Sequence, residues 1–449
     1  MKRNGNNRAF NINRVIAVTF IGIILIGTLL LCLPAASRSG KSCSFETALF
    51  TATSASCVTG LILADTWVQW SGFGQIVILS MIEIGGLGFM SAVSFVILAL
   101  RKKLSMSQRM VYSQAIGTAE AVDTKQMQKR ILKGSLLIEG TGALILAMRF
   151  WPIYGFGKAV KLGVFHAVSA FCNAGFDIFG FETPGGSMVN WSLDPCVCIT
   201  LCLLIVLGGL GFIVWDEVIR IKKVSKWSVY TRLVLLTSLI LTFAQFLLIC
   251  LTEWNNNATL GSMPFSEKML SALFQSVTCR TAGFAGLDQG ELTEAGKAVS
   301  MFFMLIGGSS GSTAGGLKTV TFVVLFLFMW SKVRGRDTIH IFSRTISDRH
   351  VLNAVALFCA MAVLAFSGAI VICMTSPVRF TDSLYETISA IATVGLTTGI
   401  TTRLSRIGKI IIMLFMYFGR VGIFTVSTGF MRQKRGENFR YAETDVLIG

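Results

Sequence analysis

The chain has 449 residues, of which 53% are hydrophobic and only 14% charged, and its formal net charge is +17. Soluble domains carry roughly 25% charged residues, so this composition cannot cover a water-exposed surface and excludes a set of soluble domains. Intrinsic disorder is excluded as well, because disordered chains have low hydrophobicity. The composition therefore predicts a polytopic membrane protein.

The apolar stretches predict the spans. A helix crosses a bilayer core with about 20 apolar residues. The first stretch follows a basic N-terminus, but its uncharged run 15–33 is longer than the about 7–15 residues of a signal-peptide core, so we interpret it as a retained span. The eight predicted spans are 15–34, 74–100, 131–151, 194–219, 230–252, 298–330, 352–375 and 407–430.

The positive charge is concentrated in alternate connections. Basic residues gather at the N-terminus, at 101–130, 220–232 and 332–349, and near the C-terminus at 432–440. Basic loops face the cytoplasm, so both termini are predicted to be cytoplasmic. The charge then needs no nucleic-acid partner to explain it. Basic segments beside a membrane can also dock anionic lipid or a soluble regulator.

Cysteine is frequent, with 11 residues, but only three histidines are present and no two cysteines are spaced as CxxC. The group Cys196, Cys198 and Cys202 is the one arrangement that resembles a metal site. Buried cysteine usually behaves as a small apolar side chain. We therefore expect no transition-metal site.

Four similar segments recur along the chain, at 50–61, 165–176, 273–284 and 386–396. They align on Gly60, Gly175, Gly283 and Gly395, and a second glycine cluster follows each of them in the next span. Such a recurrence indicates an internal repeat. We predict an all-α membrane protein with four pseudo-symmetric membrane-pore-membrane repeats, that is, eight transmembrane helices and four re-entrant pore helices around a central ion pore. The predicted boundaries are 1–14 (cytoplasmic N-terminus), 15–103, 104–223 (beginning with a cytoplasmic loop), 224–334 (with a broken last helix), 335–430, and 431–449 (cytoplasmic tail).

Each repeated segment offers a short helix and then a glycine. Glycine adopts positive φ at little cost, which lets consecutive carbonyl groups aim in one direction. Rings of carbonyl oxygens replace the hydration shell of potassium, and helix C-termini carry partial negative charge. The alternative is close helix packing through small residues. The candidate selectivity-filter residues, acting mainly through backbone carbonyls, are Cys57, Val58, Thr59, Gly60, Cys172, Asn173, Ala174, Gly175, Arg280, Thr281, Ala282, Gly283, Ala392, Thr393, Val394 and Gly395.

The sixth span contains five glycines within residues 307–316, which disfavour a helix by about 1 kcal/mol each relative to alanine. We predict a broken helix lining a cavity, with a cytoplasmic linker as the alternative. Arg420 lies in an apolar span, where a charge is costly and usually functional; a structural ion pair is the alternative. The candidate gate residues are Gly307, Gly308, Ser309, Ser310, Gly311, Ser312, Thr313, Ala314, Gly315, Gly316 and Arg420.

Three further charged residues fall in predicted spans or filter segments. Glu83 and Glu139 are interpreted as structural, since no chain of titratable groups connects them into a proton relay. Arg280 beside a cation path would repel cations. Our hypothesis is that its side chain turns away and tethers the segment.

The chain resembles, over nearly its whole length, the Trk/Ktr/HKT superfamily of potassium transporters, most closely the KtrB-type membrane subunits of bacterial Ktr uptake systems. The motifs that carry the resemblance are the segments at 58–61, 173–176, 280–284 and 393–396, the two Gly-Gly-Leu-Gly-Phe clusters at 85–89 and 208–212, and the tail 440–449.

The resemblance implies sodium-stimulated potassium uptake across the bacterial plasma membrane. It further implies a homodimer and a cytoplasmic ring of KtrA-like nucleotide-binding regulatory subunits, and it places the gate loop beneath the filter. Potassium is then the transported ion, with sodium as a second candidate, and no covalently bound cofactor is expected. The sequence departs from the potassium-channel signature, because only 393–395 keeps Thr-Val-Gly. We therefore expect weaker discrimination against sodium.

Two other functions predict different sequence features. An alternating-access transporter for another solute would have inverted or two-fold repeats with a pocket at the midplane, rather than four parallel repeats. A membrane enzyme would need a catalytic constellation, and the sequence pairs no nucleophile with a base. The chain is therefore not expected to be an enzyme.

Overall fold

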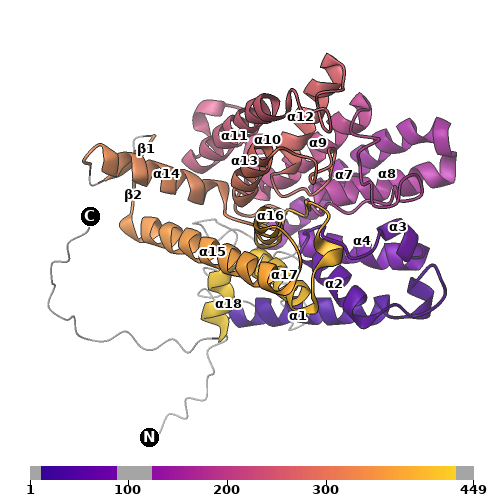
Figure 1. The fold of residues 1–449 in the computed structure, drawn as a ribbon. Helices are drawn as coiled ribbons and strands as arrows, with labels where there is room; N and C mark the ends of the chain where they lie inside the picture. The colour runs from indigo at the N-terminus through magenta and orange to yellow at the C-terminus, as the bar shows by residue number, and fades with distance from the viewer. Residues whose placement is uncertain (1–11, 88–123, 337, 343, 431–449) are drawn as a thin grey trace, which may run out of the picture.

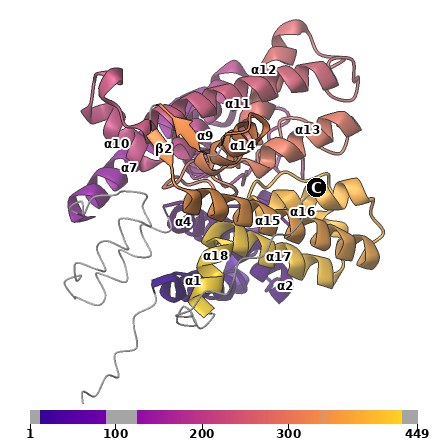
Figure 2. The same ribbon diagram turned by 90° about the vertical axis from the view of Figure 1, so that its left-hand side faces the viewer.

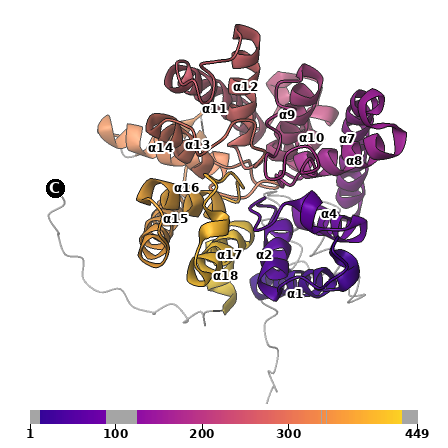
Figure 3. The ribbon, with the colours of Figure 1, turned by 45° about the vertical axis from the view of Figure 1, so that its right-hand side comes forward.

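The computed structural model of the protein describes residues 12–87, 124–336, 338–342 and 344–430. Consecutive helices form four groups that surround a central region of loops (Figure 1, Figure 3). The first group comprises α1 (Ile12–Leu31), the 3₁₀ helix η1 (Pro34–Ala36), α2 (Phe45–Ser56), α3 (Thr66–Gln69) and α4 (Gly72–Gly86). The second comprises α7 (Thr124–Tyr154), α8 (Phe156–Phe171), α9 (Pro195–Leu210) and α10 (Phe212–Arg220).

The other two groups continue in chain order. The third comprises η2 (Val224–Lys226), α11 (Val229–Glu253), α12 (Phe265–Thr278), α13 (Glu294–Leu305) and α14 (Thr319–Val333). The fourth comprises the hairpin of β1 (Ile339–Ile341) and β2 (Arg344–Ile346), then α15 (Asp348–Thr375), α16 (Phe380–Ile391), η3 (Thr401–Arg403), α17 (Arg406–Val421) and α18 (Ile423–Phe430). The predicted N-terminal segment up to residue 11, the cytoplasmic loop at 104–123 and the tail at 431–449 lie outside the described residues.

Several helices are long and apolar enough to cross a membrane. Among the described residues these are α1, α7, α11 and α15, which match the first, third, fifth and seventh predicted spans. Their outward faces expose large apolar side chains, such as Leu29 of α1, Leu137 of α7 and Leu239 of α11. Exposed apolar bands of this kind suit a lipid environment and are disfavoured in water. These helices support a multi-pass membrane protein.

Three of the other four predicted spans are each divided into two helices. The fourth span is split into α9 and α10, which are bent by 95° at Gly211, where φ is +92°. The eighth is split into α17 and α18 at Gly422, where φ is +93°. The sixth is split into α13 and α14 by the glycine-rich loop. Of the second, 74–100, only the part up to residue 87 belongs to the described residues.

Contacts between the first and last groups close the arrangement. Helix α18 packs against α1, and Figure 2 shows the two together. The hydroxyl of Tyr417 donates a hydrogen bond of 2.9 Å to the carbonyl of Ala17, which joins α17 to α1. Residues 400 positions apart are therefore neighbours, and the last group of helices meets the first.

A buried ion pair joins the third and fourth groups. Lys297 on α13 lies 3.2 Å from Asp382 on α16, and its side chain is only 6% exposed, against 17% for Asp382. Removing one partner of a buried pair costs about 3–5 kcal/mol because the other charge is left uncompensated. The pair therefore fixes the start of α13 against the start of α16.

We predict that Lys297→Met lowers the thermal unfolding midpoint of the purified protein in detergent by several degrees, since it leaves the charge of Asp382 without its partner. The control is Lys409→Met, which removes one of the two basic partners of Glu46 at a more exposed site. Exposed pairs contribute about 0–1 kcal/mol, so the control should hardly move the midpoint. Equal midpoints for the two variants would contradict this ranking.

Candidate functional site

The four repeated segments adopt the same turn. Helices α2, α8 and α16 end at the cap residues Cys57, Cys172 and Ala392, three residues before their glycine. Positive φ then occurs at the second residue before each glycine and at the glycine itself. These positions are Val58 (+55°) with Gly60 (+101°), Asn173 (+58°) with Gly175 (+67°), Thr281 (+66°) with Gly283 (+81°), and Thr393 (+52°) with Gly395 (+97°).

A hydroxyl side chain near the end of each short helix holds its turn. Ser54 Oγ accepts from the amide of Gly60, and Ser389 Oγ accepts from the amide of Gly395, both at 3.0 Å. In the other two segments the hydroxyl donates to the carbonyl of the residue after the glycine, from Ser169 to Phe176 at 2.7 Å and from Thr278 to Phe284 at 2.8 Å. In sequence, the hydroxyl residue belongs to a Ser-Ala pair in three segments (54–55, 169–170 and 389–390) and to Val277-Thr278 in the third, so this recurring pattern has a structural role.

The third segment is one residue shorter between this hydroxyl and its glycine. The cap residue of α12, Cys279, lies four residues before Gly283 rather than three. Arg280 consequently occupies the turn. Its guanidinium donates to the carbonyl of Ser238 at 3.3 Å and to the Ser238 hydroxyl at 3.2 Å, on α11. These are contacts that a tether requires.

The four glycines contact one another's segments in a closed cycle. A Cβ added to Gly60 would lie 2.6 Å from the carbonyl oxygen of Ala174, and one added to Gly175 would lie 2.8 Å from that of Ala282. The same holds for the other two glycines, because a Cβ on Gly283 would overlap the carbonyl oxygen of Val394 and one on Gly395 would overlap that of Thr59. Each residue that precedes a glycine therefore turns its carbonyl oxygen toward the glycine of a neighbouring segment.

This cycle brings together the four segments that hold the sixteen candidate filter residues. All sixteen are buried except Arg280, which is partly exposed. The geometry therefore places backbone oxygens from four segments around one axis, with no room for side chains at the glycines. Carbonyl oxygens are hard ligands of the kind that alkali and alkaline-earth cations prefer.

A cavity of about 400 Å³ opens on the far side of the glycines from the short helices. It is lined by all four glycines and by residues that follow them, including Asp65, Asp177 and Asp288. These three carboxylates are not among the residues predicted from the sequence, although each lies within five residues after a candidate filter glycine. A concave site lined by charges of one sign raises the local concentration of oppositely charged ions.

Asp177 is the carboxylate closest in sequence to a filter glycine. Burial raises its pKa to about 6, against the opposing effect of a 3.1 Å hydrogen bond from the amide of Phe179, and Asp65 raises it further. An acid with a raised pKa takes up its proton at a higher pH. The cavity therefore loses one negative charge as the pH falls through about 6.

The glycine-rich loop between α13 and α14 contacts the filter segments on the side away from the acidic cavity. The hydroxyl of Thr313 donates a hydrogen bond of 3.1 Å to the carbonyl of Phe171, the last residue of α8. A Cβ on Gly316 would lie 3.1 Å from the carbonyl oxygen of Ala392, the cap residue of α16. The loop therefore covers the C-terminal ends of the short helices, whereas the cavity lies on the other side of the four glycines.

Hydrogen bonds to neighbouring helices hold this loop in place. The amide of Ser309 donates to the carbonyl of Gly209 on α9 at 3.0 Å. The hydroxyl of Tyr230 on α11 donates to the carbonyl of Ser310 at 2.9 Å. The loop is therefore attached to helices of both the second and the third group.

The two ends of the loop are also joined to each other. The amide of Gly307 donates to the carbonyl of Leu317 at 2.8 Å, and the hydroxyl of Thr319 donates to the carbonyl of Gly307 at 3.0 Å. These bonds satisfy backbone groups that the break in the helix leaves without helical partners. The interruption of the sixth span is therefore a closed, hydrogen-bonded loop.

Arg420 connects the loop to the first group of helices. Its guanidinium donates to the carbonyl of Thr313 in the loop and to the carbonyls of Gly85 and Gly86 at the end of α4, the last at 2.9 Å. Among the described residues no carboxylate pairs with it. Arg420 therefore does not form the structural ion pair that was the alternative. Backbone carbonyl oxygens accept hydrogen bonds from its guanidinium instead.

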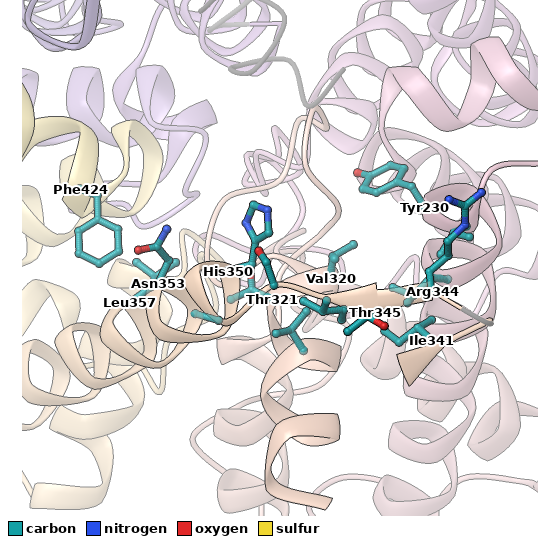
Figure 4. Close-up of a pocket in the computed structure, with 16 residues that line it drawn as sticks. Tyr230, Val320, Thr321, Ile341, Arg344, Thr345, His350, Asn353, Leu357 and Phe424 are labelled. Atoms are coloured by element: carbon teal, nitrogen blue, oxygen red, sulfur yellow. The ribbon is translucent and has the colours of Figure 1, made fainter. Parts of the chain in front are cut away.

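A second, larger cavity of about 1080 Å³ lies between α11, α14, the hairpin, α15 and α18. Figure 4 shows Tyr230 and Arg344 toward one end of it, and Asn353 and Phe424 toward the other. Most of its lining side chains are apolar. Tyr230 connects this cavity to the glycine-rich loop, because its side chain lines the cavity and its hydroxyl donates a hydrogen bond to the carbonyl of Ser310.

Comparisons with known proteins show which proteins this chain is similar to. Residues 2–441 match the model of the TrkH family, described as cation transport protein. The chain is 39% identical over 444 residues to the potassium/sodium uptake protein NtpJ of Enterococcus hirae, covering 97% of each chain. It is 35% identical over 436 residues to the Ktr system potassium uptake protein B of Bacillus subtilis, covering 97% of this chain and 96% of that one.

A solved structure shares the fold. The crystal structure of the potassium transporter TrkH from Vibrio parahaemolyticus superposes with a TM-score of 0.70 at 17% sequence identity, covering 96% of this chain and 87% of that one.

We predict that Gly395→Ala destabilises the protein, because its φ of +97° is strained for alanine and the new Cβ would overlap the carbonyl of Thr59. The thermal unfolding midpoint in detergent should fall by several degrees. The control is Gly140→Ala on α7, where a Cβ meets nothing within 4 Å. Alanine in a helix is favoured over glycine by about 1 kcal/mol, so the control should be neutral or stabilising. A neutral Gly395→Ala would contradict the close contact.

Proposed function

Because the chain belongs to the TrkH family of cation transport proteins, we propose that it carries potassium ions inward across the bacterial plasma membrane. The family consists of transporters, so the chain is not an enzyme. The names of the relatives, a potassium/sodium uptake protein and a Ktr potassium uptake protein, support potassium as the cargo and sodium as a second candidate.

The observation that carries the proposal is the closed cycle of glycines and carbonyl oxygens. In our proposal the sixteen filter residues present rings of backbone oxygens that replace the water around a potassium ion. Asp65, Asp177 and Asp288 concentrate cations in the cavity on one side. Since each segment has a single glycine, the rings are fewer than in a potassium channel, and discrimination against sodium is weaker.

The same proposal assigns the four groups of helices to four pseudo-symmetric membrane-pore-membrane repeats. Helices α2, α8, α12 and α16 are then the re-entrant pore helices, and their C-terminal ends direct partial negative charge toward the ion. The basic connections place both termini in the cytoplasm. The acidic cavity is then the outer vestibule and the glycine-rich loop lies on the inner side.

We propose that residues 307–316 and Arg420 form the gate. The loop covers the inner ends of the pore helices, and Arg420 holds it there through the carbonyl of Thr313. The chain further assembles as a homodimer with a cytoplasmic ring of nucleotide-binding subunits, and sodium stimulates it. The name of the Bacillus subtilis relative, a protein of a Ktr system, supports a membrane subunit that works with other components.

Uptake of radioactive rubidium, a potassium analogue, into liposomes containing the purified protein tests the cargo. We expect uptake above that of protein-free liposomes, with potassium competing at lower concentrations than sodium. Equal competition by both ions would contradict the preference for potassium. No rubidium uptake, together with coupled uptake of an organic solute, would favour the alternating-access alternative.

The gate has its own test. We predict that Arg420→Ala and a deletion of 309–314 each raise rubidium flux several-fold, because both release the loop from the inner end of the filter. The matched control is Arg406→Ala at the opposite end of the same helix, whose side chain is 91% exposed. Unchanged flux in both gate variants would refute a gating role for the loop.

A further inference from the structure

A cluster of three potential metal ligands lies behind the second filter segment. It comprises Glu83 of α4, Glu139 of α7 and the thiol of Cys172 at the end of α8. One ligand atom from each lies within 4.8 Å of the other two, and the Cys172 thiol is 3.4 Å from Glu83 Oε2. The fold therefore gathers two carboxylates and a sulfur that are far apart in sequence.

The carboxylates of this cluster form no ion pair with a described basic residue. Glu139 is only 4% exposed, and its Oε1 has no hydrogen-bond partner. Arg420, whose guanidinium reaches the end of α4, directs its donors to backbone carbonyls there and in the glycine-rich loop. A buried carboxylate oxygen without a partner is costly, so the cluster is suited to a ligand that brings positive charge.

We propose that Glu83, Glu139 and Cys172 bind a divalent cation of the zinc class. Carboxylate oxygens and thiolates are both zinc ligands, and three protein ligands leave the fourth tetrahedral position open. Ligand atoms on one tetrahedral ion lie roughly 3–4 Å apart, given bond lengths of about 2.0–2.3 Å. The observed limit of 4.8 Å is larger than this spacing, so a bound ion would draw the ligand atoms closer together. A hard cation such as sodium would not use the sulfur.

The proposed site was not expected from the sequence, in which no transition-metal motif is present. The expectation was based on short spacings, whereas these ligands come from three helices. Bound metal would fix the end of α8 against α4 and α7. Since Cys172 begins the second filter segment and Gly86 packs against its sulfur, the site lies directly behind the proposed ion path.

The test is a titration of the purified full-length protein with Cd²⁺ under reducing conditions, counting bound metal and following the ultraviolet charge-transfer band of the cadmium–thiolate bond. We expect one tight equivalent per chain. Cys172→Ser should abolish the band, and Glu139→Gln, which nearly preserves shape, should weaken binding at least tenfold. The controls are Cys202→Ser, at a buried thiol outside the cluster, and Cys359→Ser, at an exposed one, and both should bind as the wild type does.

The proposal is overturned if Cys172→Ser keeps the band, or if Glu139→Gln binds cadmium as tightly as the wild type. The second result would mean that the two carboxyl groups share a proton instead of holding a metal. A monodisperse size-exclusion profile identifies variants that fold. The titration reads metal binding directly, so it stays decisive even if the protein transports no rubidium.

Discussion

The close approach of four glycines to four carbonyl oxygens is the constraint on which the rest of the structure depends. Each short helix must end three or four residues before its glycine, because the two positive-φ residues that follow cannot continue a helix. A side chain at any of these glycines would push a neighbouring backbone away. The hydroxyls of Ser54, Ser169, Thr278 and Ser389 then hold the turns, and the groups of helices surround them.

Glycines also let the helices α4, α9 and α17 approach the short helices closely. A Cβ on Gly85 would overlap the carbonyl of Ser56, and one on Gly208 would overlap that of Phe171. A Cβ on Gly419 would likewise overlap the carbonyl of Ile391, the last residue of α16. In three groups, a span glycine therefore packs against the last residue of the short helix. The third group departs from this pattern, because its glycines form the loop.

Two observed features depend on local sequence: the four similar turns follow from the recurring glycines, and the break between α13 and α14 follows from glycines within an apolar stretch. The sequence did not predict the bend at Gly211, because a single glycine in an apolar run is also compatible with a straight helix. The cluster of Glu83, Glu139 and Cys172 could not be predicted either. Its members meet only through the packing of α4, α7 and α8, which no spacing in the sequence encodes.

The contacts of Arg420 determine what movement of the loop requires. The guanidinium is partly buried, and its acceptors are backbone carbonyls from α4 and from the loop. A buried charge that loses an acceptor is costly unless water or another acceptor replaces it. If the loop withdraws, the carbonyl of Thr313 leaves and water must reach Arg420. In the proposed gate, withdrawal of the loop and hydration of Arg420 would therefore occur together, because the guanidinium needs an acceptor in place of the Thr313 carbonyl.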